Sequence, residues 1–404
     1  MELEDNFTNL RFNSPIRTKQ QPRYRRLQTI SPSKRSHGDR FICNRNNIDE
    51  ESKTSLLTPI KNVRVLRFTK KKPEAREERI LYKQPVQRKT LQPIKVLDAP
   101  GIVDDYYLNL MDWSLTNQVS IALSESVYLW NANHGTVSEL LQLEQNVCSL
   151  RFIQDGSFLA VGTETEIQLW DVEREKKVRT MQGHSSRVGS LAWNAHILSS
   201  GSRSGSIINS DVRIAKHAVS EWNEHEQEVC GLEWSPDGSQ LASGSNDNLV
   251  KIWEGASSKS VHTLSEHLAA VKAVAWCPWQ SKLLATGGGT SDKTVKFWDS
   301  VSGNSLSTLH TGSQVTSIKF SKSCKEFITS HGYAENKMCI YKYPNLQLVG
   351  DVEGHESRIL HTALSPDGTT VCSVAADEVI KFYNCWDKKQ VQSRPLRKLK
   401  ATIR

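Results

Sequence analysis

Two arginines flank a pair of apolar residues in the stretch DRFICNR, Asp39 to Arg45. Phe41 and Ile42 could anchor in a partner's pocket, while Arg40 and Arg45 could form bidentate hydrogen bonds with its carboxylates. This combination of side chains could dock to another protein. Taken alone, the stretch is better explained as a chance apolar pair in a basic linker.

Three Ser-Pro or Thr-Pro sites each carry a basic residue two positions after the proline. Cyclin-dependent kinases prefer this pattern, and a phosphate adds a charge of about −1.5 to −2. Because the three sites surround the Asp39–Arg45 stretch, phosphorylation could fold that stretch back or repel an acidic receptor. The predicted phosphorylation sites are Ser14, Ser31 and Thr58.

The residue pattern does not indicate catalytic chemistry. The sequence contains no credible Ser/His/Asp triad or carboxylate pair, and no helix is expected after the glycine run Gly287–Gly289, so it fails as a phosphate loop. The eight cysteines are scattered without a CxxC pair, which gives no metal-ligand spacing. We therefore predict a protein that is not an enzyme, with no cofactor and no metal.

The elements that would position these residues recur along the chain. Seven short apolar strands end at residues 130, 170, 210, 253, 298, 341 and 383, a period just above forty. Trp-Asp and Gly-His pairs accompany them, for example Trp170-Asp171 and Gly183-His184, as is typical of WD repeats. One repeat cannot bury its own apolar faces, so seven should stack into a closed ring. The predicted fold is all-β, a seven-bladed WD-repeat β-propeller.

Polar residues within the repeats are expected to be structural. They occupy the positions at which WD repeats hydrogen-bond their turns, which favours scaffolding over catalysis. The residues in question are His184, His355, Asp247, Asp292 and Asp377.

Closure of the ring requires a strand from the other end of the chain. No clear outer strand follows Tyr383. The segment around Lys95–Leu97 precedes the first inner strand, predicted at Tyr106–Trp113, and is the natural candidate to complete the last blade. Such closure would remove an exposed sheet edge.

The net charge of +8 is unevenly placed. Residues 1–94 hold 22 Lys and Arg against 10 Asp and Glu and show no sustained apolar period, whereas the remainder holds 30 against 34. This composition predicts a disordered, basic regulatory tail over 1–94, a propeller over 95–386 and a short C-terminal tail over 387–404. No apolar run is long enough for a membrane span. Nucleic-acid binding is disfavoured, because no aromatic residues interleave the Lys70–Lys72 run for base stacking.

Several segments resemble the fizzy and fizzy-related family, activators of the anaphase-promoting complex. They include VLDAP (Val96–Pro100), DDYYLNLMDWS (Asp104–Ser114), SGSNDNLVKIW (Ser243–Trp253) and the long stretch Ala273–Asp299. DRFICNR resembles the family's C-box, with Cys43 in place of a proline that would fix the backbone. RVLRF is similar to its Lys-Ile-Leu-Arg motif, and the last two residues are similar to its Ile-Arg tail. The resemblance implies ligase docking through Asp39, Arg40, Phe41, Ile42, Arg45, Arg64, Val65, Leu66, Arg67, Ile403 and Arg404.

The resemblance also implies two sites for short degradation signals, or degrons. In a propeller, the loop between the second and third strands and the loop entering the first strand lie on one face, so residues far apart in sequence can converge there. The predicted KEN-box site comprises Asn246, Asn248, Thr290, Gln314 and Arg358, with the arginine suited to a peptide carboxylate. The predicted destruction-box site lies between the first and last blades. It uses Asp98 and Glu378 for an arginine and Leu97, Trp130 and Val137 for a leucine.

The function that the sequence predicts is that of a substrate adaptor and activator of the anaphase-promoting complex, a ubiquitin ligase. Its expected partners are the ligase subunits, degron-bearing substrates such as cyclins and securin, and spindle-checkpoint proteins if the chain is of the fizzy type. The expected location is the nucleus and cytoplasm. The alternative is a generic WD-repeat scaffold for signalling complexes with no ubiquitin role. The residues do not decide whether the chain belongs to the fizzy or the fizzy-related subfamily.

Overall fold

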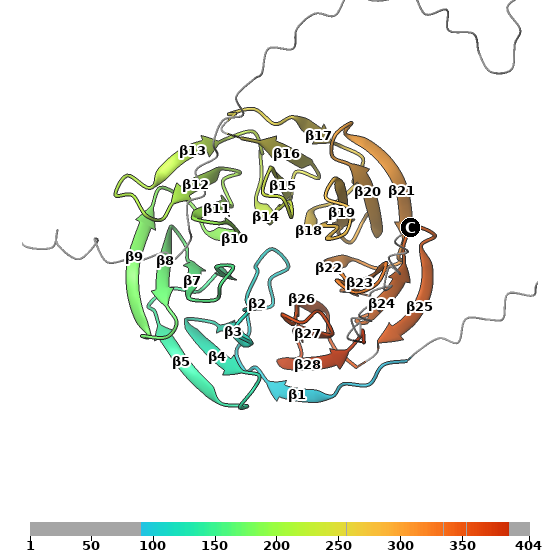
Figure 1. The fold of residues 1–404 in the computed structure, drawn as a ribbon, viewed down its shortest axis with the longest axis horizontal. Helices are drawn as coiled ribbons and strands as arrows, with labels where there is room; N and C mark the ends of the chain where they lie inside the picture. The colour runs from blue at the N-terminus through green and yellow to red at the C-terminus, as the bar shows by residue number, and fades with distance from the viewer. Residues whose placement is uncertain (1–89, 256, 334, 353, 388–404) are drawn as a thin grey trace, which may run out of the picture. The chain divides into compact units, whose positions relative to one another are not determined.

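The computed structural model describes residues 90–387, apart from residues 256, 334 and 353. The docking residues predicted at 39–45, 64–67 and 403–404 therefore lie outside the described residues, as do Ser14, Ser31 and Thr58. Within the described part, all regular structure is β-strand, arranged as seven four-stranded sheets around a central axis (Figure 1). The predicted seven-bladed β-propeller is confirmed.

Each blade is an antiparallel sheet whose strands run in chain order from the axis outward, except in the last blade. Blades 1 and 2 contain β2 (Met111–Trp113), β3 (Gln118–Leu123), β4 (Ser126–Asn131), β5 (Val137–Gln142), β6 (Ser149–Phe152), β7 (Phe158–Gly162), β8 (Glu166–Asp171) and β9 (Lys176–Gln182). Blades 3 and 4 contain β10 (Val188–Asn194), β11 (Ile197–Ser202), β12 (Ile207–Asp211), β13 (Ala218–Trp222), β14 (Val229–Trp234), β15 (Gln240–Ser245), β16 (Val250–Glu254) and β17 (His262–Leu264).

The remaining blades follow the same plan. Blades 5 and 6 contain β18 (Val271–Trp276), β19 (Leu283–Gly288), β20 (Thr294–Asp299), β21 (Asn304–His310), β22 (Val315–Phe320), β23 (Glu326–His331), β24 (Met338–Lys342) and β25 (Gln347–Val352). Blade 7 contains β26 (Ile359–Leu364), β27 (Thr370–Ala375), β28 (Val379–Asn384) and, from the start of the described chain, β1 (Lys95–Asp98).

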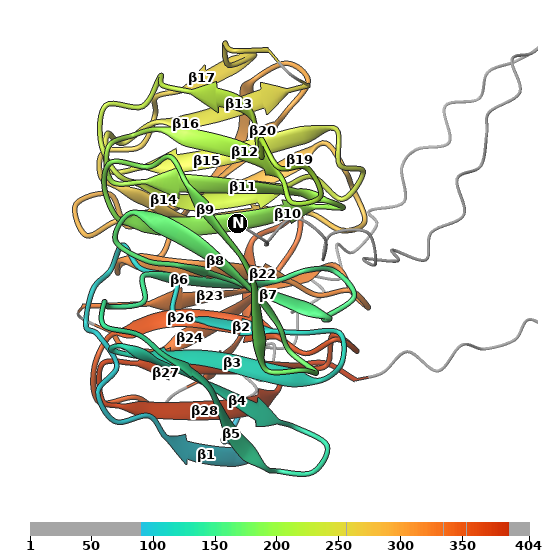
Figure 2. The same ribbon diagram turned by 90° about the vertical axis from the view of Figure 1, so that its left-hand side faces the viewer.

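Closure of the ring occurs in blade 7, as predicted. Strand β1 pairs antiparallel with β28, with Lys95 opposite Phe382 and Asp98 opposite Val379. In both views β1 lies beside β28 and next to β4 and β5 of blade 1 (Figures 1 and 2). A shared core then spans the junction, because Leu97 packs against a buried cluster that includes Trp130 and Phe382. The rings of Trp130 and Phe382 lie 4.7 Å apart.

The first inner strand is shorter than predicted. The sequence suggested a strand over Tyr106–Trp113, but β2 covers only Met111–Trp113. The preceding residues are engaged elsewhere: the Asn109 side-chain amide donates to the carbonyl oxygens of Gly189 at 2.7 Å and Cys230 at 2.9 Å. These contacts hold the segment across the ends of other blades, where it cannot extend a strand of its own blade.

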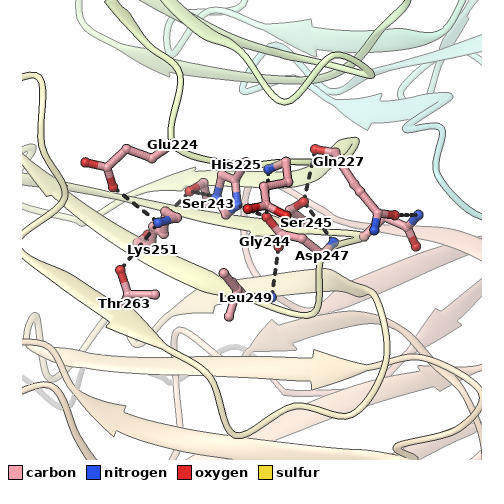
Figure 3. Close-up of polar contacts among 12 residues, drawn as sticks. Glu224, His225, Gln227, Ser243, Gly244, Ser245, Asp247, Leu249, Lys251 and Thr263 are labelled. Carbon is pink, nitrogen blue, oxygen red and sulfur yellow. Dashed lines mark hydrogen bonds and ion pairs between the residues drawn. The ribbon is translucent and has the colours of Figure 1, made fainter.

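In several blades, a series of buried hydrogen bonds stabilises the turns between strands. In blade 4, Nδ1 of His225 lies 2.8 Å from Asp247, and its Nε2 lies 2.8 Å from the Ser243 hydroxyl (Figure 3). The Ser243 hydroxyl also accepts from Trp253. Comparable pairs join His267 to Asp292 and His355 to Asp377, and blade 3 uses serines around His184 instead. The structural role predicted for His184, His355, Asp247, Asp292 and Asp377 is confirmed.

Replacement of Asp247 by alanine should lower the free energy of unfolding by about 2 kcal/mol, because the buried His225 loses a charged partner. Burial raises the pKa of Asp247, but the hydrogen bond and charge of His225 and the backbone N–H groups of Leu249 and Glu226 together outweigh burial, and the net pKa is lowered. Stability from this carboxylate is therefore present above its unfolded pKa and is lost as the pH falls through the lower, folded value. Urea denaturation at several pH values measures both effects.

The matched control is Ser204→Ala, at the corresponding loop position of blade 3, where His184 bonds to Ser206 and Ser200. This variant should unfold at nearly the wild-type urea concentration. An Asp247→Ala variant as stable as Ser204→Ala would contradict the assigned role.

Candidate peptide-binding sites

The five residues predicted for the KEN-box site lie on loops of one face of the ring. Asn246 and Asn248 lie between β15 and β16, and Thr290 lies between β19 and β20. Gln314 immediately precedes β22, and Arg358 immediately precedes β26. We call this the upper face, and the face that carries the loops between the first and second strands the lower face.

A short segment, Asp104–Tyr107, connects these loops across the upper end of the channel. The Tyr107 hydroxyl donates to the Asn246 side chain at 3.0 Å, and the Tyr106 hydroxyl donates to the Val315 carbonyl at 3.1 Å. Nε of Arg358 donates to Asp104 Oδ1 at 2.5 Å. The segment thus contacts Asn246, Arg358 and the residue next to Gln314, which belong to three different blades.

Gln314 offers a buried, unused acceptor on this face. The residue is 5% exposed. Its Oε1 is buried without a hydrogen-bond partner among the described residues. Gly332 makes this arrangement possible, because a Cβ at that position would lie only 2.3 Å from Gln314 Oε1. An unpaired carbonyl oxygen suits an ammonium or amide donor of a ligand.

Arg358 is fixed in place before any ligand arrives. Its guanidinium also donates to the Asp104 backbone carbonyl at 2.8 Å and lies 4.9 Å from the centre of the Tyr333 ring. The aromatic ring and Asp104 together hold the arginine at the rim. A ligand carboxylate would share the guanidinium with Asp104 or displace it.

The other predicted residues differ in how they are held. The Asn246 amide donates to Oε1 of Gln227 at 2.6 Å, in the loop region shown in Figure 3. Asn248 has a positive φ of 67°, a conformation that Asn tolerates better than most residues. Thr290 is exposed on its loop. The structure therefore places all five residues on the upper face, with Asn248, Thr290 and Gln314 outside the direct contacts of Asp104–Tyr107.

An ion-pair cluster anchors the Asp104–Tyr107 segment to the blades. Arg187 donates to Asp105 at 2.7 Å and forms two hydrogen bonds with Glu228, each 2.8 Å long. The Glu228 side chain is only 6% exposed. Burial lowers the pKa of Arg187, but the bonds to Glu228 and Asp105 outweigh it and raise the net pKa.

The predicted destruction-box residues lie at the junction of blades 7 and 1. Asp98 ends β1 at the exposed rim, and Gly101 N–H donates to the Glu378 carboxylate at 3.1 Å, so Glu378 lies against the turn that follows Asp98. Trp130 and Val137 are paired on β4 and β5 of blade 1. Val137 is 63% exposed, whereas Trp130 is 7% exposed.

Lys95 covers the apolar end of this junction. Its Nζ lies 4.4 Å from the centre of the Trp130 ring. The distance from Lys95 to Asp98 along the extended strand is about 10 Å, at roughly 3.3 Å per residue. An extended peptide with an arginine and a leucine three positions apart spans the same backbone length.

A family model described as the CDC20/Fizzy WD40 domain matches residues 97–383. The chain belongs to the CDC20/Fizzy family. It is 51% identical over 305 residues to the anaphase-promoting complex subunit cdc20 of Dictyostelium discoideum, a match that covers 74% of this chain and 61% of that protein. The matched part is thus somewhat less than two thirds of the Dictyostelium relative.

Two further relatives of this CDC20/Fizzy chain extend the comparison. The WD repeat-containing protein slp1 of Schizosaccharomyces pombe (strain 972 / ATCC 24843) is 46% identical, with 83% of this chain and 72% of slp1 covered. A chain in the crystal structure of the mitotic checkpoint complex is 50% identical, with a TM-score of 0.73, and the match covers 74% of this chain and 96% of that chain. The CDC20/Fizzy family is a family of non-catalytic adaptors. Among the described residues, no helix has the length and apolar character of a membrane span.

Sequence reasoning missed the residues that position the two predicted sites. Tyr107 and Asp104 fell within a predicted strand or next to it, and Lys95 was considered only for closure. A weak signal was available: two acidic residues and two tyrosines precede β2, an unusual content for a strand that lines a channel. The long-range partners of Asp104–Tyr107 lie between 82 and 254 residues away in sequence, so spacing could not identify them.

Replacement of Arg187 by methionine should release the Asp104–Tyr107 segment, because Glu228 loses its ion pair and Asp105 its anchor. We expect faster cleavage within residues 104–109 in limited proteolysis, and a loss of about 2 kcal/mol in the free energy of unfolding. Arg213→Met is the matched control, since within the described part of the chain Arg213 pairs only with the nearby Asp211 and its side chain is 47% exposed. Equal cleavage rates in the two variants would exclude this anchoring role.

Proposed function

We propose that this chain is an activator and substrate adaptor of the anaphase-promoting complex and carries out no catalysis of its own. It binds KEN-box peptides on the upper face and destruction-box peptides at the junction of blades 7 and 1. Its partners are the ligase, the degron-bearing substrates and spindle-checkpoint proteins, in the nucleus and cytoplasm. The observation that carries the proposal is that a CDC20/Fizzy propeller presents two preorganised polar sites at which distant parts of the chain converge.

The upper face suits the KEN box by its charges and its acceptors. The fixed guanidinium of Arg358 complements the glutamate, and the buried, unpaired Gln314 oxygen would accept from the lysine if the side chain turned toward the peptide. The Asn246 amide, held by Tyr107 and Gln227, provides the donor and acceptor pair that an asparagine side chain requires. Because these groups are already positioned, little ordering entropy is lost when the peptide binds.

The blade junction suits the destruction box in a different way. Two carboxylates, Asp98 and Glu378, lie at one end and match the fork of an arginine. At the other end Leu97, Trp130 and Val137 provide apolar surface, over part of which Lys95 lies. A leucine entering there would move the flexible Lys95 stem aside and remove apolar area from water.

Separate substitutions should distinguish the two sites. Asp98→Ala should weaken a destruction-box peptide about tenfold or more and leave a KEN-box peptide unchanged, and Arg358→Ala should do the reverse. Each change removes one charge-assisted hydrogen bond, and about 1.4 kcal/mol corresponds to tenfold in affinity. Fluorescence anisotropy with both labelled peptides against both variants measures this.

Asp155→Ala is the matched control for the peptide experiment, since Asp155 is an exposed aspartate on a lower-face loop. It should bind both peptides with wild-type affinity. Normal destruction-box affinity in Asp98→Ala would refute the assignment of that site, and normal KEN-box affinity in Arg358→Ala would refute the other.

Reconstitution with purified ligase tests the adaptor function as a whole. The wild-type chain should stimulate ubiquitination of a destruction-box substrate, and deletion of residues 39–45 or 403–404 should abolish most of the stimulation because docking is lost. Asp98→Ala should retain docking in a pull-down and lose stimulation, which separates docking from substrate capture. Equal ubiquitination with and without the two docking segments would defeat the proposal.

A further inference from the structure

The central channel encloses a small polar cavity that neither degron site uses. Its volume is about 50 Å³, and its lining includes Asn109, Arg151, Glu233, Lys272, Lys319 and His361. A water molecule needs roughly 10–15 Å³ of such space, so the cavity has room for one small ion or a few waters. These residues come from the inner strands β6, β14, β18, β22 and β26 and from the segment before β2.

Positive charge in this cavity exceeds its negative charge. Three cationic side chains and one imidazole line it, against a single carboxylate, Glu233. Arg151 is paired with Asp112 at 3.5 Å. Among the described residues, however, no carboxylate forms an ion pair with Lys272 or Lys319.

Several donors in the cavity are only partly used. Lys272 is 3% exposed, and its ammonium donates to the Leu360 carbonyl at 2.6 Å, which uses one of its three N–H groups. Nδ1 of His361 is buried without a hydrogen-bond partner. A buried charge without a countercharge costs far more than a buried neutral group.

The protein can lower this cost in two ways. One is loss of protons, and burial lowers the pKa of Lys272 to about 7 and also lowers the pKa values of Lys319 and His361. The other is an anion, which supplies the missing negative charge and accepts the unused hydrogen bonds. Burial also raises the pKa of Glu233, so that carboxylate is itself disfavoured in its charged form.

Tyr106 lies on the upper side of the cavity, and two larger cavities lie on its lower side. The Tyr106 ring centre lies 5.5 Å from Lys272 Nζ, and the Tyr106 hydroxyl donates to the Val315 carbonyl. The two larger cavities, of about 560 and 260 Å³, share Arg151 and Glu233 with the inner one. A small solute would enter the inner cavity from the lower face, opposite the KEN-box loops.

We propose that the inner cavity is a binding site for a small inorganic anion of the size of chloride or phosphate, held by Lys272, Lys319 and His361 beneath Tyr106. The anion links blades 5, 6 and 7 around the channel and stabilises the closed ring. Because Lys272 must be protonated to hold the anion and burial lowers its pKa to about 7, binding strengthens as the pH falls through 7, while the neutral His361 ring can donate from one nitrogen. Lys272 also faces Cys230, Asp105 and Arg358, which modify its charge but do not enter the cavity.

The test measures the thermal midpoint of the full chain while sodium chloride, or sodium phosphate, replaces sodium gluconate at constant ionic strength. The wild-type midpoint should rise by about 2 °C or more at saturation, as expected for a ligand that binds only the folded state. The rise should be larger at pH 6 than at pH 8. A bromide soak of crystals should place an anomalous peak inside the cavity.

Lys319→Met is the decisive variant. The Lys319 side chain forms no hydrogen bond or ion pair among the described residues, so its removal should leave the fold intact. It should lose most of the anion-dependent rise, whereas Lys322→Met should keep it, since Lys322 is exposed and lines only the outer 260 Å³ cavity. Lys272→Met should also remove the pH dependence. An equal rise in wild type and Lys319→Met, or an inner cavity without a bromide peak, would overturn the proposal.

Discussion

The pairing of β1 with β28 is the interaction on which the rest of the structure depends. Six blades are built from consecutive strands, but the seventh takes its outer strand from residues 95–98, almost three hundred positions before its partners. Without this pairing, β28 would present an open edge, and the apolar junction around Trp130 and Phe382 would be exposed to water. The contact couples the two ends of the ring, so loss of one strand affects all seven blades.

The repeat architecture could be predicted from sequence because it is a local property. Strand alternation, turn residues and the aromatic residue that ends each third strand recur with nearly constant spacing, and each repeat obeys the same rules. The closure could be predicted as well, since a missing outer strand after Tyr383 needs a replacement. The placement of the five predicted KEN-box residues on loops of one face could be predicted from topology, because each loop's face follows from its place in the repeat.

The preorganisation of the sites could not be predicted, since it depends on long-range side-chain contacts. Asp104–Tyr107 lies outside the repeat, and its partners Asn246, Val315 and Arg358 are separated from it by more than a hundred residues. The expected strand over Tyr106–Trp113 failed for the same reason: tertiary hydrogen bonds outweighed the strand propensity of the two tyrosines. Lys95 over Trp130 is likewise a contact that only closure of the ring brings about.

The proposed destruction-box site shares residues with the closure of the ring. Leu97 and Asp98 belong to the strand that closes the ring, and Trp130 and Val137 belong to the blade against which that strand packs. A peptide that contacted both sides would bind only the closed form, so its binding free energy would add to that of closure. A scaffold whose site lay within one blade would gain no such coupling. A destruction-box peptide at the proposed site would therefore also hold the two ends of the propeller together.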